Sequence, residues 1–393
     1  MNFDPILDRY SNQIANRLWL AEEQYLMLAG ERVRRLQDMT PEQLRAYLYS
    51  QQGPGDLNTD IRRANRRLDR AHRANERDLE RLFNTAVTLS YTEGAALATR
   101  KCAALPPLET FRSRAGYMLM AAIGQYRHMA KSGAVGTDYR NTIGKMTRLI
   151  TMQGADLPSV MRKTIRELAQ QGITTISYAS GRKMRMDSAV RRDLVGEFTG
   201  IVQDIQKQIA AEIGADGWEI SAHEHPADDH EDVQGHVFTN FEFEQLQNHE
   251  RATDIDGRVH LLGERAIGEF NCRHIAYPFV IGASQRTHSP EELQRIKERN
   301  KQGVTWKEQN ITLYQAEQQQ RSLETAMRRE RENLSLLATV KDTDPLMRGY
   351  WRQSKNRIAG LRREYARLGE VVRPHGLRMK PERSYMPRVT VRA

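Results

Sequence analysis

This chain of 393 residues has few cysteines and no long apolar run, so it lacks the residues that form disulfides and membrane spans. Two cysteines exclude a disulfide framework and are typical of a protein made in a reducing cytoplasm. The most apolar stretch, residues 117–123, is far too short to cross a bilayer. Residues 1–9 lack the basic-then-apolar pattern of a cleaved signal peptide. We therefore expect a protein that neither enters a membrane nor is exported by a cleaved signal.

Phosphate-binding loops and dense apolar segments are scarce as well. No segment has the glycine-rich form GxxxxGK[ST] of a P-loop, so an ATP-driven motor or other NTPase has no support. Aromatic residues make up 7% and hydrophobic residues 39% of the chain, and the mean hydropathy is -0.70. This composition permits modest cores and leaves much of the chain facing solvent or partners. At about 150 residues per domain, the length predicts two or three structural units.

The excess charge is positive and is confined to one end of the chain. The net charge of +10 comes from 60 Lys and Arg against 50 Asp and Glu. Residues 346–393 carry 13 basic and three acidic side chains, so the remainder is neutral, with 47 of each sign. We expect a neutral body with a basic C-terminal extension, which suits phosphate-rich or acidic partners.

Residues 1–212 have the spacing of long amphipathic helices. Apolar residues from Ile6 to Leu28 recur at steps of three and four, and a second apolar stripe runs from Val190 to Ile209. These patterns predict an all-helical N-terminal region whose apolar faces dock on one another.

Six arginines within that region also follow a helical spacing. They are Arg62, Arg66, Arg70, Arg73, Arg77 and Arg81. On a helix they form one basic stripe, which Glu76, Asp78 and Glu80 partly neutralise. Two interpretations stay open: a solvated face laced with ion pairs, or a contact surface for nucleic acid or an acidic protein.

The composition changes near residue 213. Short β-prone segments at 218–222, 237–241, 259–262 and 277–281 are separated by glycines. Eight of the 11 histidines fall between His223 and His288, and acidic residues are dense from Glu219 to Asp256. These features predict a small α+β module over residues 213–288, so the predicted fold class is mainly α with a small α+β module.

The remaining segments are polar. Residues 289–345 predict a helical region that opens with a capping box at Ser289, is interrupted at Gly303 and resumes near Thr305. Residues 314–334 have few apolar anchors, so this helix either needs a partner surface or remains exposed. Residues 346–393 predict a basic helix and then, after Pro374, a tail with too little apolar content for a core, which we expect to be extended until bound.

Ligand-type side chains occur as two pairs in the α+β module. His223 and His230 form one pair, Cys272 and His274 the other, and together they offer a set for a tetrahedral zinc ion. Cys272 and His274 lie two apart, which on a strand points both to one face. Nearby residues that could replace one of the four are His225, Asp228, Asp229 and His236.

Two other interpretations of this cluster stay open. The histidines can be hydrogen-bonded loop and core groups around a small buried Cys272. Alternatively, the cluster serves a metal-dependent nucleic-acid-processing enzyme, although no clear strand-strand-helix frame surrounds Asn271 and His274 as in the His-Asn-His nucleases. A nucleophile such as Cys272 or Ser221 has candidate bases in the sequence but no defined geometry.

Several motifs resemble, in order, the signature of the bacteriophage minor capsid protein 2 family over roughly residues 110 to 365. The first group is the run WEISAH at 218–223, His230, Gln234-Gly235, Phe238 and Asn271-Cys272-Arg273-His274, followed by Tyr314, Gln320-Arg321, Glu324 and Arg328. The approach to the module is similar at residues 171–173, 180–182 and 189–192. One departure is Asp228-Asp229, where members commonly have Arg-Pro, which makes this loop acidic.

The resemblance implies a non-enzymatic virion protein, present in multiple copies around the portal ring and active in head assembly, genome packaging or ejection. The implied partners are the portal protein and the major capsid protein, after synthesis in the host cytoplasm. The basic tail adds a second expectation, which is contact with packaged double-stranded DNA or, alternatively, with acidic side chains of the portal or capsid. A third interpretation is a cytoplasmic DNA-binding protein that is absent from virions. The cations expected to contact DNA or the portal are Arg352, Lys355, Arg362, Arg363, Arg373, Arg378, Lys380, Arg383, Arg388 and Arg392.

Overall fold

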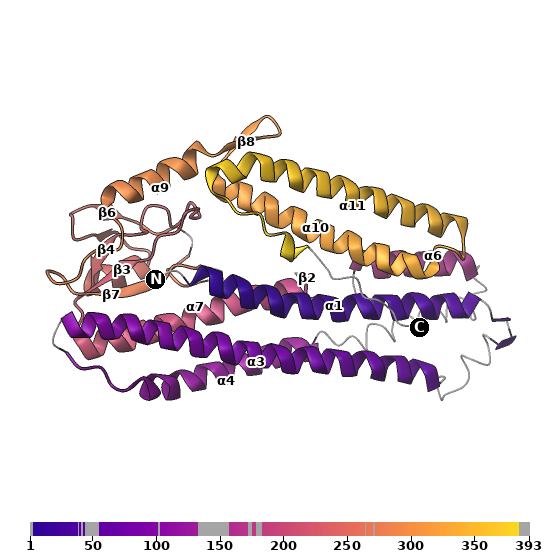
Figure 1. Cartoon of the computed structure of the whole chain (residues 1–393), viewed down its shortest axis with the longest axis horizontal. Coiled ribbons are helices and arrows are strands. Elements are labelled where there is room, and N and C mark those ends of the chain that lie inside the picture. The colour runs from indigo at the N-terminus through magenta and orange to yellow at the C-terminus, as the bar shows by residue number, and fades with distance from the viewer. Residues whose placement is uncertain are drawn as a thin grey trace.

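Helices make up most of the part of the chain that the computed structural model describes. This part comprises residues 3–37, 39–40, 42–43, 55–100, 103–132, 157–171, 175–177, 183–263, 265–269 and 272–384. The fold is mainly α with a small α+β module at one end, as the sequence predicts (Figure 1). Within the described ranges, no helix combines the length and the apolar content that a bilayer crossing requires.

Long N-terminal helices form the body of the molecule. They are α1 (Asp4–Gln37), α3 (Gly55–Arg100), α4 (Leu108–Ser132), α6 (Leu157–Gln171) and α7 (Met186–Ile213). The predicted apolar face of α1 is confirmed, since Ile14, Leu18 and Tyr25 are buried in the largest core. One difference is a short antiparallel pair, β1 (Thr175–Ser177) and β2 (Lys183–Arg185), in a region predicted to be all-helical.

The α+β module is built on a three-stranded antiparallel sheet. Its strand order is β4-β3-β7, with β3 (Gly217–Ile220) between β4 (Val237–Thr239) and β7 (Ala276–Phe279). Helix α8 (Asn240–Gln247) and the small pair β5 (Ala252–Thr253) and β6 (Val259–His260) cover it. Each predicted β-prone segment thus contains a strand.

The C-terminal third is a helical hairpin preceded by a short β-hairpin. Its elements are α9 (Pro290–Gln302), β8 (Val304–Trp306), β9 (Gln309–Ile311), α10 (Leu313–Val340) and α11 (Pro345–Val372). The capping box at Ser289 is confirmed. The expected resumption of the helix near Thr305 is wrong: Gly303, at φ +57, ends α9, β8 follows at Val304, and α10 begins only at its own capping box at Thr312.

The segment after α11 folds back onto the body. It contains the short 3-10 turns η1 (Arg373–His375) and η2 (Pro381–Arg383). Leu377 and Met379 are buried against Leu368 and Val372 of α11. The expectation of an extended chain after Pro374 is therefore wrong as far as residue 384, because two apolar side chains find a helical surface to cover. Residues 385–393 lie outside the described part of the chain.

One carboxylate joins three separate parts of this fold. Asp8 of α1 accepts hydrogen bonds from Arg273 before β7 (3.0 Å), from Lys380 (2.6 Å) and from Arg383 (3.0 Å) of the C-terminal segment. Burial would raise the pKa of Asp8, but the three cations outweigh it and hold that pKa well below its usual range. The carboxylate therefore stays charged and holds α1, the module and the C-terminal segment together.

Replacing Asp8 with Asn should lower the free energy of unfolding at neutral pH by about 3 kcal/mol, because three partly buried cations lose their counter-charge. Because the pKa of Asp8 is depressed in the folded state, that state binds fewer protons than the unfolded state, in which the pKa of Asp8 is about 3.9. The stabilising contribution is complete above that pH and declines as the pH falls below it. Urea unfolding across this range should show the wild-type and variant stabilities converging in acid.

A matched control is Asp342→Asn. Asp342 pairs with Arg348 at 3.3 Å, but its side chain is 71% exposed, so its loss should cost less than about 1 kcal/mol. Equal effects of the two substitutions at neutral pH would contradict the role assigned to Asp8.

Candidate metal centre

The antiparallel sheet brings the predicted ligands of the module close together. Residues that follow β3 lie opposite residues that precede β7. The Ser221 backbone N–H, for example, donates a hydrogen bond to the Ile275 carbonyl oxygen with an N···O distance of 2.9 Å. His223 and His274 therefore become neighbours. The turn after residue 227 returns the chain to β4 and places His230 beside them. Gly235, at φ +73, closes this turn, and its backbone N–H donates a hydrogen bond to the Ile220 carbonyl oxygen.

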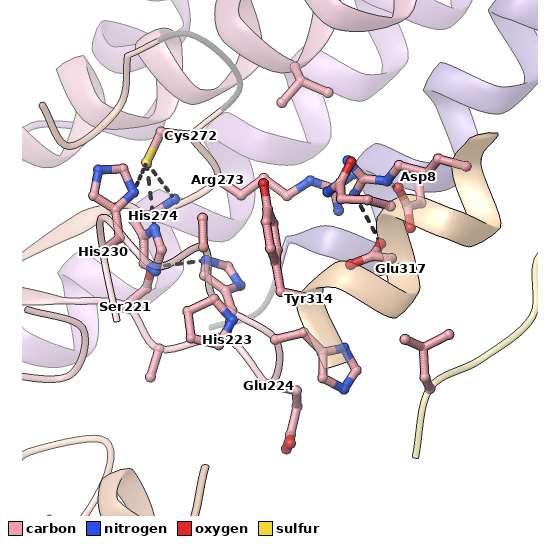
Figure 2. Close-up of a pocket in the computed structure, with 18 of the residues that line it drawn as sticks. Asp8, Ser221, His223, Glu224, His230, Cys272, Arg273, His274, Tyr314 and Glu317 are labelled. Atoms are coloured by element: carbon pink, nitrogen blue, oxygen red, sulfur yellow. Dashed lines mark hydrogen bonds and ion pairs between the residues drawn. The ribbon is translucent and has the colours of Figure 1, made fainter. Parts of the chain in front are cut away.

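His230, Cys272 and His274 form a buried group with the geometry of a metal centre. The Cys272 Sγ lies 3.6 Å from His230 Nδ1 and 3.5 Å from His274 Nδ1. A tetrahedral zinc ion with ordinary Zn–S and Zn–N bonds separates such ligand atoms by about 3.6 Å. Both sulfur–nitrogen distances match this value, and the ligand atoms of the three residues all lie within 4.8 Å of one another. Figure 2 shows them at one side of a cavity.

The outer hydrogen bonds orient both imidazoles for this role. His230 Nε2 lies 3.0 Å from the Arg265 carbonyl oxygen, and His274 Nε2 lies 3.4 Å from Gln234 Oε1. Both partners are acceptors, which assigns the proton of each ring to Nε2 and leaves the Nδ1 lone pairs facing Cys272. One thiol proton can serve only one lone pair, whereas a metal ion serves both.

Burial shapes the ionisation of the same three groups. It lowers the pKa of His230 and holds that of His274 well below its usual range, while it raises the pKa of the Cys272 thiol. Imidazolium is thus disfavoured at both histidines. A metal ion would stabilise the thiolate that burial opposes.

His223 is the predicted ligand that the structure leaves outside this group. Its ring packs edge-on against His274, with centroids 4.5 Å apart, and its Nε2 lies 3.5 Å from Ser221 Oγ. Asp229, a predicted substitute, is engaged by the Arg265 guanidinium at 2.7 and 2.8 Å. Three of the four predicted ligands therefore converge, and His223 lies next to them on the cavity wall.

A second histidine group was not predicted as a unit. Asp254 Oδ2 lies 2.7 Å from His236 Nδ1 and 3.1 Å from His260 Nε2. The other carboxylate oxygen accepts the amides of Asp256 and Arg258. Two imidazole N–H groups and two amides satisfy this carboxylate without any ion, so the group is explained as a hydrogen-bonded support of the β5-β6 pair. His236 in the sequence was the only signal for it.

The cavity beside the metal centre has a volume of about 830 Å³ and joins the module to both helical regions. Tyr314 and Glu317 of α10 face the histidines across it, and Arg273 and Asp8 form its far wall (Figure 2). Side chains on which the family resemblance rests meet here from distant segments: His223, His230, Cys272, Arg273, His274, Tyr314, Arg321, Glu324 and Arg328. The motifs therefore describe one place in the molecule.

The predicted contact cations separate into three groups. Exposed side chains on α11 and just after it are Arg352, Lys355, Arg362, Arg363, Arg373 and Arg378. Lys380 and Arg383 instead bind Asp8, and Arg383 is only 4% exposed, so these two face inward. Arg388 and Arg392 lie outside the described residues.

Comparison with known proteins identifies one family. The model of the family described as phage minor capsid protein 2 matches residues 61–363 of the chain. No curated protein and no solved structure matches. The matched range includes the whole α+β module, α9, α10 and the first two thirds of α11.

Protein purified without a histidine tag should contain about one zinc ion per chain, and Cys272→Ser should remove most of it, because a hydroxyl is a far weaker zinc ligand than a thiolate. Elemental analysis of the purified protein measures both. Replacing zinc with cobalt gives a second readout, since a thiolate ligand produces a charge-transfer absorption band.

Cys102→Ser is the matched control and should keep both the zinc and the cobalt band. His260→Ala tests the second histidine group and should leave the zinc content unchanged. Metal-free wild-type protein with an undisturbed fold, or zinc that follows His260 rather than Cys272, would contradict this assignment.

Proposed function

The chain belongs to the phage minor capsid protein 2 family, and on that premise we propose that it is a structural component of the portal vertex. Membership makes it a phage minor capsid protein and therefore a virion protein. The proposal adds a position, which is contact with the portal ring, and a role in head assembly, genome packaging or ejection. The feature that carries it is the outer face of α11.

The α11 outer face is basic and contains an aromatic side chain. Arg352, Lys355, Arg362 and Arg363 are exposed along it. At its edge, the partly buried Trp351 ring lies between Lys341 and Lys355, whose ammonium groups are 4.9 and 5.2 Å from the ring centroid. Aromatic and arginine side chains together are typical of protein interfaces. An acidic surface of the portal protein complements such a face.

The metal centre fits this structural role. Zinc held by His230, Cys272 and His274 would join the turn after residue 227 to the segment that leads into β7. That segment also carries Arg273, which binds Asp8 of α1. A structural zinc would therefore fix the module in the position from which it contacts the helical body.

An enzyme is the second candidate, favoured by one observation. Three protein ligands beside a cavity leave a fourth tetrahedral position for water or substrate, as catalytic zinc sites do. In that case the zinc would supply an activated water, and the cavity would hold a nucleic-acid substrate.

Charge reversal on the α11 outer face tests the portal contact. The triple substitution Arg352→Glu, Lys355→Glu and Arg363→Glu should abolish co-purification with the portal protein of the same phage, because three attractions become repulsions. The matched control reverses Arg66, Arg70 and Arg77 on α3 and should co-purify normally. A triple α11 variant that still binds the portal as tightly as wild type would refute this contact.

The two candidate functions differ in one assay. We expect the zinc-loaded full chain to leave duplex DNA intact, with or without added magnesium or manganese. Particles assembled with His230→Ala should still contain the protein if its residual fold is stable. Cleavage of DNA that His230→Ala abolishes would replace the structural function with the enzymatic one.

A further inference from the structure

Helix α3 presents a continuous row of arginines to solvent. The exposed side chains are Arg62, Arg66, Arg70, Arg73, Arg77 and Arg81. At 100° per residue they fall within an arc of about 100°, and from first to last they extend for about 28 Å along the helix. The opposite side of α3 is buried, with Leu68, Leu79 and Leu82 against the helical body. This α3 arginine face is therefore a straight, one-sided feature of the surface.

Two of the three acids near these arginines bind arginines of other helices. Glu76 binds the Arg127 guanidinium of α4 at 2.7 and 3.0 Å, and that bond lowers the pKa of Glu76. Asp78 is buried and binds Arg17 of α1 at 2.6 Å, while its other oxygen lies 3.4 Å from Arg81. Two of the three neutralising charges thus serve contacts between helices.

Half of the row consequently keeps a positive charge that no neighbouring acid neutralises. Arg66, Arg70 and Arg77 form no ion pair with any other residue in the described part of the chain. The exposed acids Asp69 and Glu80 lie at one edge of the arc. The interpretation as a face laced with ion pairs therefore does not fit the middle of α3.

The surroundings of the row distinguish between its two classes of partner. From residue 62 to 81, the described exposed side chains are all polar or charged, and the leucines are buried. A stable protein interface has an apolar or aromatic core, which this face lacks and the α11 outer face approaches with Trp351. Binding to a phosphate backbone needs only cations, because release of counterions supplies the affinity.

We propose that the α3 arginine face is a binding site for the sugar-phosphate backbone of duplex DNA, without readout of base sequence. This site goes beyond the portal contact and lies on a different helix. In Figure 1, α1 and α10 lie between α3 and α11, and contacts join α3 to α1, α1 to α10 and α10 to α11. The molecule can therefore hold DNA on α3 while α11 contacts a protein.

The dependence of DNA affinity on salt measures the proposed contacts. Each phosphate contact contributes about -0.9 to the slope of log affinity against log salt concentration. In the full chain, Arg66→Gln, Arg70→Gln and Arg77→Gln together should make that slope shallower by about 2.7 for a mixed-sequence duplex. The loss of DNA affinity at a given salt concentration should be the same for duplexes of different sequence. The three side chains are exposed, so thermal unfolding should be unchanged.

The matched control removes the same charge from α11 through Arg352→Gln, Lys355→Gln and Arg363→Gln, and it should keep the wild-type slope. The proposal is overturned if the full wild-type chain does not bind DNA, if the α3 variant retains the full slope, or if the α11 variant accounts for the whole loss. Loss of portal binding by the α3 variant with an unchanged slope would make this face a protein site. These results are independent of whether the α11 outer face contacts the portal.

Discussion

The ion cluster at Asp8 is the constraint on which the arrangement of the molecule depends. A single carboxylate near the start of α1 binds Arg273 from the α+β module and Lys380 and Arg383 from the C-terminal segment. These partners are 265, 372 and 375 residues away in the sequence. The cluster also forms one wall of the cavity whose other wall is the His230, Cys272 and His274 group, the candidate metal centre. The position of the α+β module and the geometry of the histidine group are therefore linked, because Arg273, the residue before His274, is one of the cations that Asp8 binds.

Local patterns in the sequence predicted the elements of the fold well. Apolar periodicity located α1 and α7, and reciprocal side-chain bonds at Ser289 marked the start of α9, because these signals act within a few residues. Besides the short β1-β2 pair in the region predicted to be all-helical, two errors concern segments whose conformation depends on distant surfaces. Leu377 and Met379 look too sparse for a core until α11 supplies one, and the segment after Gly303 forms β8 and β9 because it packs beside α11.

The sequence predicted those parts of the candidate site that follow from residue spacing and from the pairing of neighbouring strands. Cys272 and His274 share one short segment, so their proximity followed from spacing, and His230 joined them once the turn closed on β3. Spacing could not decide between His230 and His223 as ligands, because that choice depends on which imidazole finds an outer acceptor such as the Arg265 carbonyl. The pairing of Asp254 with His236 and His260 likewise needs β4 and β6 to be neighbours, which no sequence motif encodes.

The charge distribution also depends on contacts between distant segments. It changes which surfaces are expected to bind a partner. Counting along the chain assigns the whole positive excess to residues 346–393. Folding turns Lys380 and Arg383 inward to Asp8, and it engages Glu76 and Asp78 of α3 with arginines of α4 and α1. Part of the basic extension is thereby neutralised, and part of the neutral body becomes basic on one face. Since partners respond to the potential at the surface rather than to the sum along the chain, the folded molecule has two cationic faces, although the summed charge points only to the C-terminal extension.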